Sequence, residues 1–158
     1  MSKPHLAYLN LGSNIQPEAS LPKAVELLSK FGEIKKLSSV WESEAIGTEG
    51  PNYLNVCLLF RCAHSLAELK EKVVHQTESA LGRVRTVDKF AARTLDVDII
   101  LFDGKSLNDE NWSLPFIVIP LAEIFPEFVL PSSGESIKET ATRLRQRVWI
   151  ETRQGVLD

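Results

Sequence analysis

Apolar residues fall into four short runs that alternate with polar positions or are rich in β-branched side chains. A period of two, bounded by glycine, proline or asparagine, is typical of a β-strand. The pattern therefore predicts strands over residues 6–11, 34–41, 53–61 and 95–102. Turn-forming residues follow the first strand at Gly12, Ser13 and Asn14, and follow the fourth at Asp103 and Gly104.

Two segments between these strands have the spacing of amphipathic helices. Residues 19–31 and 65–81 place apolar side chains three or four positions apart, and a glycine follows each segment. This spacing puts the apolar side chains on one face of a helix, and a glycine commonly ends one. Ser65 and Glu68 add a capping box at the start of the second segment.

After residue 115, the sequence pattern indicates secondary structure less clearly. Residues 116–119 form a short apolar run, and residues 119–131 contain three prolines, so at most a short helical turn is expected there. Residues 136–147 predict a final helix, and residues 148–152 predict a last short strand.

The order strand, helix, strand, strand, helix, strand matches the ferredoxin-like arrangement. We therefore predict an α+β fold, a βαββαβ sandwich with one mostly antiparallel sheet and helices packed on it. The length favours a single domain over residues 1–158, in which residues 132–158 form a C-terminal helical extension. The fold alone does not identify an activity, because many unrelated functions share it.

The composition and net charge indicate which kinds of binding partner to expect. The net charge is −3, with 44% hydrophobic and 25% charged residues, as in an ordinary globular protein. The charge gives no global reason to expect nucleic-acid binding. No apolar run approaches the roughly 18 residues of a membrane helix, and the N-terminal sequence lacks the features of a signal peptide. These features predict a cytoplasmic protein whose partners are neither nucleic acids nor membranes.

The stretch LDVDII raises a chemical question, because two aspartates interrupt an apolar strand. Alternation puts Asp96 and Asp98 on one face, with Cα atoms roughly 6.5 Å apart. Carboxylates this close would repel each other unless a cation lay between them. Mg²⁺ is commonly held by one or two carboxylates together with substrate phosphates. The alternative is a solvated strand face with both aspartates paired to nearby arginines.

A basic stretch runs directly into this strand. Arg83, Arg85, Lys89 and Arg93 stand against a single acid, Asp88. Guanidinium groups bind phosphate oxygens through paired hydrogen bonds, although a basic loop can also be merely solvated. Together with the two aspartates, the stretch predicts a site for a nucleotide triphosphate and Mg²⁺. The chain has no GxxxxGK[ST] phosphate-binding loop and no protein-kinase signature.

A second group of residues has the chemistry of a heterocycle site. Tyr53 and Asn55 lie on one face of the predicted third strand, where an aromatic ring and an amide can stack on and hydrogen-bond a flat ring. Gly12 follows the first strand and allows a ligand to approach the backbone closely. An ordinary turn at Gly12 and an ordinary pair on the sheet surface are the alternatives.

The motifs LGSN, PNYLN, LGRVR and RTLDVDIILF together resemble the 6-hydroxymethyl-7,8-dihydropterin pyrophosphokinase family of folate biosynthesis, over residues 6–131. The resemblance implies a ferredoxin-like sandwich that transfers the β,γ-pyrophosphate of ATP to the hydroxymethyl group of a reduced pterin and releases AMP. Two Mg²⁺ ions would bridge carboxylates and phosphates. The implied partners are ATP and the reduced pterin, and a monomer is expected, with a dimer as the alternative.

The resemblance also implies roles at matching positions. The catalytic residues would be Arg83, Arg93, Asp96 and Asp98, of which Asp96 and Asp98 would bind the metal. The residues that contact ATP would be His75, Glu78, Arg85, Lys89, Phe90, Ile99 and Ser113. The residues that contact the pterin would be Gly12, Ser43, Ile46, Tyr53, Asn55 and Phe116.

The chain departs from the family pattern at two loops. Phe90-Ala91-Ala92-Arg93 stands where the family usually has W-G-P-R. Pro115 joins directly to Phe116, so a loop with a histidine and an arginine that contact ATP phosphates is missing. Each lost charge-assisted hydrogen bond is worth about 1.5–3 kcal/mol. If both act in the transition state, the rate falls by about 10²–10⁴.

Three functions remain in view. The first is an active pyrophosphokinase with a trimmed ATP loop. The second, motivated by the missing loop, is a slow or inactive paralogue that binds pterin or nucleotide without turnover. The third is a transferase with another acceptor, because Glu44 stands where the family usually has a proline beside the pterin.

Overall fold

The computed structural model describes residues 3–45, 50–82 and 95–157. Within these ranges, the sheet is built from seven strands, β1 His5–Ser13, β2 Glu33–Leu37, β3 Val40–Ser43, β4 Tyr53–Cys62, β5 Asp96–Phe102, β6 Lys105–Ser106 and β7 Ile150–Arg153. The helical segments are α1 Pro17–Leu28, α2 Leu66–Glu68, the π-helical η1 Leu69–Val74, α3 His75–Ala80, the 3₁₀ segment η2 Asp109–Ser113, α4 Pro115–Ile124 and α5 Ile137–Arg145.

The sheet has the order β6-β5-β1-β4-β3-β7, with β2 pairing to the same strand as β3, and each pairing among the described strands is antiparallel. The long strands β1 and β4 lie at its centre. Strand β5 pairs with β1, and β2 and β3 pair with β4, which is the strand order of the ferredoxin-like sandwich. The predicted fold class is confirmed.

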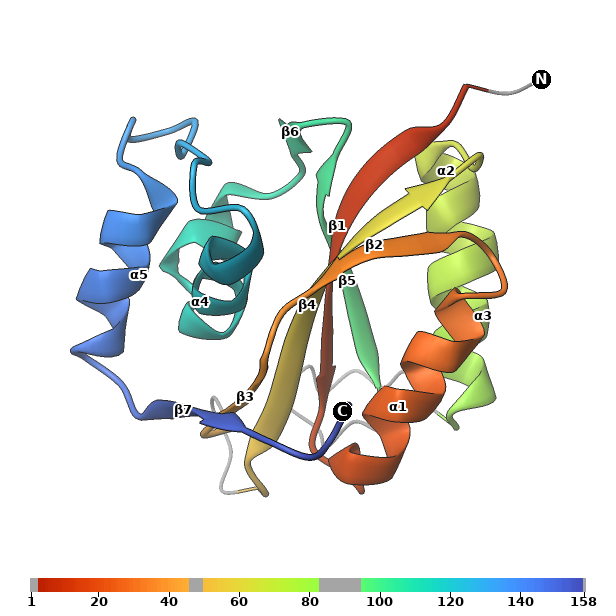
Figure 1. Cartoon of the computed structure of the whole chain (residues 1–158), viewed down its shortest axis with the longest axis horizontal. Coiled ribbons are helices and arrows are strands. Elements are labelled where there is room, and N and C mark those ends of the chain that lie inside the picture. Colours follow the sequence, from red (N-terminus) through yellow and green to blue (C-terminus); the bar gives the residue numbers. More distant parts are fainter. Residues whose placement is uncertain (1–2, 46–49, 83–94, 158) are drawn as a thin grey trace.

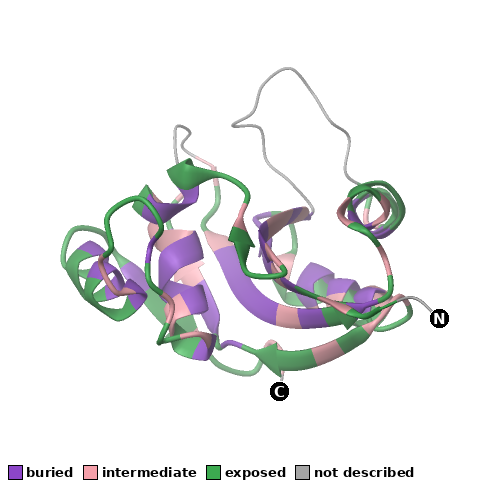
Figure 2. Ribbon diagram, turned by 90° about the horizontal axis from the view of Figure 1, so that it is seen from above, coloured by how far each residue is buried: buried purple, intermediate pink, exposed green. Residues whose placement is uncertain are grey.

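Helices cover both faces of this sheet (Figure 1). On one face, α1 and the continuous α2–η1–α3 helix pack on alternate residues of the central strands, including Leu9, Leu11, Val56 and Leu58. On the other face, α4 and α5 bury a second core. Buried residues follow the strands and the sides of the helices that face them (Figure 2). In the C-terminal segment, α5 belongs to this second layer because it packs on α4, whereas β7 joins the sheet by pairing with β3.

The predicted strand over residues 34–41 is two strands, because the chain bends at Ser38 and Ser39. The hydrogen bonds to β4 nevertheless continue through the bend. Ser38 donates its backbone N–H to the Cys57 carbonyl at 2.8 Å, and its Oγ accepts from the Cys57 N–H at 2.9 Å. A side-chain oxygen thus replaces a backbone carbonyl, which a hydrophobicity pattern does not reveal.

The expectation of at most a helical turn between residues 119 and 131 is wrong over its first half, because α4 runs for ten residues and includes Pro120. Pro115 lies in the first turn, where a missing N–H costs little. The bond lost at Pro120 is offset by burial, since Ile117, Val118 and Leu121 are nearly inaccessible. The capping box at Ser65, by contrast, forms as predicted.

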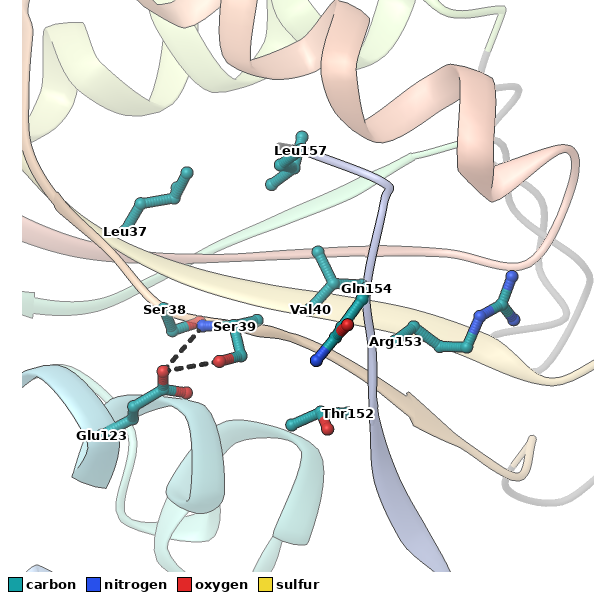
Figure 3. A pocket seen from close by; sticks show the side chains of 9 residues that line it. All are labelled: Leu37, Ser38, Ser39, Val40, Glu123, Thr152, Arg153, Gln154 and Leu157. Atoms are coloured by element: carbon teal, nitrogen blue, oxygen red, sulfur yellow. Dashed lines mark hydrogen bonds between the residues drawn. The ribbon is translucent and has the colours of Figure 1, made fainter.

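Glu123 joins α4 to the bend between β2 and β3. Its carboxylate accepts hydrogen bonds from Ser39 N at 2.9 Å, Ser39 Oγ at 2.7 Å and Trp41 Nε1 at 3.0 Å. Figure 3 shows Glu123 and Ser39 at the rim of a cavity of about 340 Å³, which is also lined by β7 and by Leu157 near the C-terminus. One exposed carboxylate therefore ties α4 to β3 and to the bend before it.

The Glu123→Ala variant is expected to lower the free energy of unfolding by about 1–2 kcal/mol, because three donors lose a charged acceptor. Urea denaturation measures this change. Glu127→Ala, just beyond the same helix, is the matched control and should stay within about 0.5 kcal/mol of the wild type. Equal losses in both variants would contradict the anchoring role of Glu123.

Candidate active site

The two aspartates of β5 lie on the sheet face that carries α4 and α5. Asp96 and Asp98 are both partly exposed, whereas Leu95 and Val97 are buried in the core under α1 and α3. The alternation predicted from the sequence is confirmed for this segment. A β-bulge between β5 and β1 places Tyr8 opposite Leu101 and Leu9 opposite Ile99, so Ile100 is the extra residue.

Strand pairing places two rows of residues across β5, β1 and β4, one through each aspartate. In the first row, Gly12 lies opposite Asp96 on one side and opposite Asn55 on the other. In the second row, Asn10 lies opposite Asp98 on one side and opposite Cys57 on the other. Residues paired in this way share one sheet face, with Cβ atoms about 4.5–5.5 Å apart. The face therefore joins the predicted metal residues to the predicted pterin residues through β1.

Asn55 is fixed in place within the first row. It is 2% exposed, and its Nδ2 donates to Ser43 Oγ at 3.0 Å. A Cβ added to Gly12 would lie 2.9 Å from Asn55 Oδ1 and 3.8 Å from Tyr53 Cδ1. The absence of a side chain at Gly12 thus leaves room for the Asn55 amide and the Tyr53 ring on the same side of the sheet. Four predicted pterin residues lie together here.

Glu78 supports the acidic strand from the opposite face. Its side chain is 2% exposed, and Oε2 accepts a hydrogen bond from Val97 N at 2.9 Å, at the residue between the two aspartates. A buried carboxylate that binds a backbone N–H makes a strong, oriented contact. Glu78 thereby restrains the part of β5 that carries Asp96 and Asp98.

The residues predicted to contact ATP are more scattered. His75 is exposed on α3, and Ile99 packs into the core beneath α1 and α3, on the face opposite Asp98. Ser113 is exposed in η2 and donates from Oγ to the Glu110 carbonyl at 2.9 Å. Phe116 is partly buried at the start of α4 and packs on the second core.

Part of β5 lies at the edge of the described sheet. Among the described strands, β6 pairs with β5 through Leu101 and Phe102 alone, so the segment from Asp96 to Asp98 forms an edge of the sheet. Helix α3, which carries His75, covers one face of the sheet, and Asp98 lies on the other face. The remaining predicted site residues lie outside the described part of the chain; they are Ile46, Arg83, Arg85, Lys89, Phe90 and Arg93.

Asn10 was missed in the sequence, although it interrupts the apolar run LAYLNL. It is 2% exposed, and its Oδ1 has no hydrogen-bond partner. A buried polar atom without a partner costs about 1–3 kcal/mol, so such atoms are uncommon unless a ligand or ion uses them. A polar residue on an otherwise apolar strand was the signal that could have identified it.

The described residues contain no group of three or more histidine, cysteine, aspartate or glutamate side chains arranged to hold a metal. Two carboxylates alone are nevertheless enough where phosphate oxygens complete the coordination of Mg²⁺.

In the same described part of the chain, none of the helices has the length and apolar character needed to cross a bilayer.

Comparison with known families decides the identity. The model of the 7,8-dihydro-6-hydroxymethylpterin-pyrophosphokinase family matches residues 8–126. Enzymes named 2-amino-4-hydroxy-6-hydroxymethyldihydropteridine pyrophosphokinase are 34% identical in Synechocystis, over 84% of this chain and 73% of theirs, and 34% identical in Aquifex aeolicus, over 84% and 88%. The chain belongs to this family. As a member, it is a diphosphotransferase with ATP as co-substrate, and the predicted enzyme class is confirmed.

Solved structures support the fold. A Plasmodium falciparum HPPK-DHPS chain, crystallised with pteroate, superposes with a TM-score of 0.68 over 93% of this pyrophosphokinase. The sequence identity is 12%, and the match spans 43% of the longer Plasmodium chain. The pyrophosphokinase thus corresponds to less than half of that protein.

Proposed function

We propose that this pyrophosphokinase joins ATP and 6-hydroxymethyl-7,8-dihydropterin on the sheet face around Gly12. The observation that carries this proposal is the pairing of Gly12 with Asp96 on one side and Asn55 on the other. It puts a carboxylate suited to a metal and an amide suited to a heterocycle two strands apart. Pyrophosphate transfer needs the phosphate chain and the acceptor hydroxymethyl group to meet at such a distance.

The residues at this face fit Mg²⁺. Asp96 and Asp98 are partly exposed carboxylates on one face, and an amide oxygen without a partner lies beside them at Asn10. Oxygen donors of this kind are what Mg²⁺ prefers, with phosphate oxygens as the remaining ligands. When bound, the metal would neutralise charge that develops on the transferred phosphates. The resemblance to the family implies two such ions.

The protein's own residues position the reactants. Asn55, held by Ser43, would hydrogen-bond the edge of the pterin, while Tyr53 and Phe116 would flank its ring. Glu78 would hold β5 in place through Val97, so that both aspartates keep their spacing. We assign Arg83 and Arg93 to the transferring phosphates, and the ATP contacts to His75, Glu78, Arg85, Lys89, Phe90, Ile99 and Ser113. Ile46 and Ser43 complete the proposed pterin site.

A binding protein without turnover is the second candidate, and the junction before α4 favours it. Segment η2 ends at Ser113 and α4 begins at Pro115, with Leu114 as the single residue between them. The structure therefore has no loop at this point, where the family pattern implies a histidine and an arginine for the ATP phosphates. The proposed activity requires other cations, such as Arg85 and Lys89, to replace them.

The test is AMP formation from ATP and Mg²⁺, with and without 6-hydroxymethyl-7,8-dihydropterin, with the pterin diphosphate identified by mass spectrometry. We expect AMP only when both the pterin and Mg²⁺ are present. Saturable pterin binding by calorimetry without AMP would instead establish the binding protein. AMP formed with another acceptor, and not with this pterin, would favour the third function considered above.

The Gly12→Ala variant is expected to weaken pterin binding by about tenfold or more, because the added Cβ would displace the Asn55 amide from 2.9 Å away. Calorimetric titration with the pterin measures this change. Binding of a non-hydrolysable ATP analogue serves as the internal control and should stay within about twofold. Unchanged pterin affinity would place the pterin elsewhere.

The division into one domain over residues 1–158, the monomeric state and the cytoplasmic location remain predictions of the sequence. Support for the first comes from the packing of α5 on α4 and the pairing of β7 with β3, which tie residues 132–158 to the sheet. Size-exclusion chromatography with light scattering would measure the oligomeric state directly.

A further inference from the structure

Asn10 occupies the position next to the acidic pair on β1. It pairs with Asp98 of β5 and lies one row from Asp96, on the same face as both carboxylates. It is almost completely buried, and its Oδ1 has no hydrogen-bond partner. None of the roles implied by the family resemblance falls on this amide.

None of the neighbours of Asn10 donates a hydrogen bond to its Oδ1. On β4 it faces Cys57, whose thiol is buried and whose backbone N–H already bonds to Ser38 Oγ. Burial raises the pKa of the Cys57 thiol well above its usual range, so this neighbour is neutral and contributes no charge to the site. Along β1, the same face presents Tyr8 and Gly12. The other cross-strand neighbour of Asn10 is Asp98.

We propose that Asn10 is a third protein donor of the metal site, whose Oδ1 binds the divalent cation held by Asp98, directly or through one bound water. Cross-strand partners have Cβ atoms about 4.5–5.5 Å apart, so an amide and a carboxylate of equal length can converge on one ion. An amide oxygen is a hard donor of the type that Mg²⁺ accepts. It also adds a ligand without adding a third negative charge to two carboxylates that already repel each other.

The inference rests on the proposed metal role of Asp96 and Asp98, and its test separates the two. Binding of Mn²⁺, which replaces Mg²⁺ and has an EPR signal when free, is titrated with a non-hydrolysable ATP analogue present. The analogue alone is titrated in parallel. The variants are Asn10→Leu, which keeps the side-chain volume without a donor atom, Asn10→Ala, Asp98→Ala, and the control Cys57→Ala, which alters the other partner in the same row.

We expect Asn10→Leu and Asn10→Ala to weaken Mn²⁺ binding by about tenfold or more, as for other residues that support metal ligands. Cys57→Ala should leave the affinity within about twofold. The melting temperature of Asn10→Leu should equal or exceed that of the wild type, because an unpaired polar atom is replaced by an apolar group of similar shape. Lower metal affinity without lower stability is a combination that a purely structural role would not produce.

The Asn10→Asp variant tests the same role by an expected gain in metal affinity. A carboxylate that reaches the cation should bind Mn²⁺ more tightly than the wild-type amide, and saturating Mn²⁺ should raise the melting temperature of this variant more than that of the wild type. Wild-type Mn²⁺ affinity in Asn10→Leu and Asn10→Ala, with a loss in Asp98→Ala, would overturn the role of Asn10 alone. Unchanged affinity in Asp98→Ala would overturn the proposed metal site itself.

Discussion

Replacing Asp98 with alanine is expected to lower the rate of pterin-dependent AMP formation by about 10³-fold or more. A carboxylate that holds the metal contributes several kcal/mol to stabilising charge on the transferred phosphates. The fold should persist, because Asp98 is partly exposed and lies at the edge of the described sheet. Removing one of two neighbouring carboxylates also relieves repulsion between them. Initial rates at saturating ATP and pterin measure the effect, with thermal unfolding measured alongside.

Asp109→Ala is the matched control for this variant, because Asp109 is an exposed aspartate at the start of η2. It should keep wild-type activity. Full activity in Asp98→Ala would refute the metal role of the acidic pair. A loss of activity accompanied by a large fall in melting temperature would assign Asp98 to folding instead.

Replacing Arg93 with alanine is expected to lower kcat by about 10²–10³-fold while changing the affinity for ATP much less. Such a split is the signature of a contact made mainly in the transition state, and the magnitude is that of one lost donor to a developing charge. Arg93 lies outside the described residues, and the prediction follows from its place in the RTLDVDI motif. Single-turnover kinetics and calorimetry with an ATP analogue separate the two quantities.

Arg147→Ala, which removes an exposed arginine beyond α5, controls for the loss of one positive charge. It should leave both kcat and ATP affinity unchanged. If Arg93→Ala weakens ATP binding by as much as it slows turnover, Arg93 binds phosphate in the ground state. The assignment to the transition state would then be wrong.

The alternation of apolar and polar residues along the strands predicted which side chains share a sheet face at the candidate site. The period of two in LDVDII placed Asp96 and Asp98 on one face and Val97 in the core, as the structure shows. The capping box at Ser65 and the order of strands and helices predicted the ferredoxin-like sheet. These features are local, since each depends on a few neighbouring residues whose preferences agree with the final fold.

Features that depend on distant partners could not be predicted from the pattern. Ser38 ends β2 because its hydroxyl bonds to Cys57 of another strand, and α4 tolerates Pro120 because the helix is buried against the sheet. The register between neighbouring strands could not be read from the pattern either. The pairing of Asn10 with Asp98, and the place of Gly12 between Asp96 and Asn55, were therefore not predicted. Register is set by the packing of whole faces rather than by one strand.

Glu78 shows a related difference between the resemblance and the structure. The resemblance places it at the nucleotide, whereas the structure shows its carboxylate bonded to Val97 N. Under the proposed role, this side chain would both restrain β5 and contact the nucleotide. The proposed contact of Glu78 with ATP, from the side of β5 opposite the aspartates, would require ATP to pass around the edge of the sheet.

The most direct test of the central claim is a crystal structure with Mn²⁺ and a non-hydrolysable ATP analogue, with Mn²⁺ located by its anomalous signal. We predict anomalous peaks at about 2.0–2.2 Å from carboxylate oxygens of Asp96 and Asp98, as for Mg²⁺, with the phosphates over the edge of β5. Mn²⁺ bound only to the nucleotide and away from both aspartates would contradict the account.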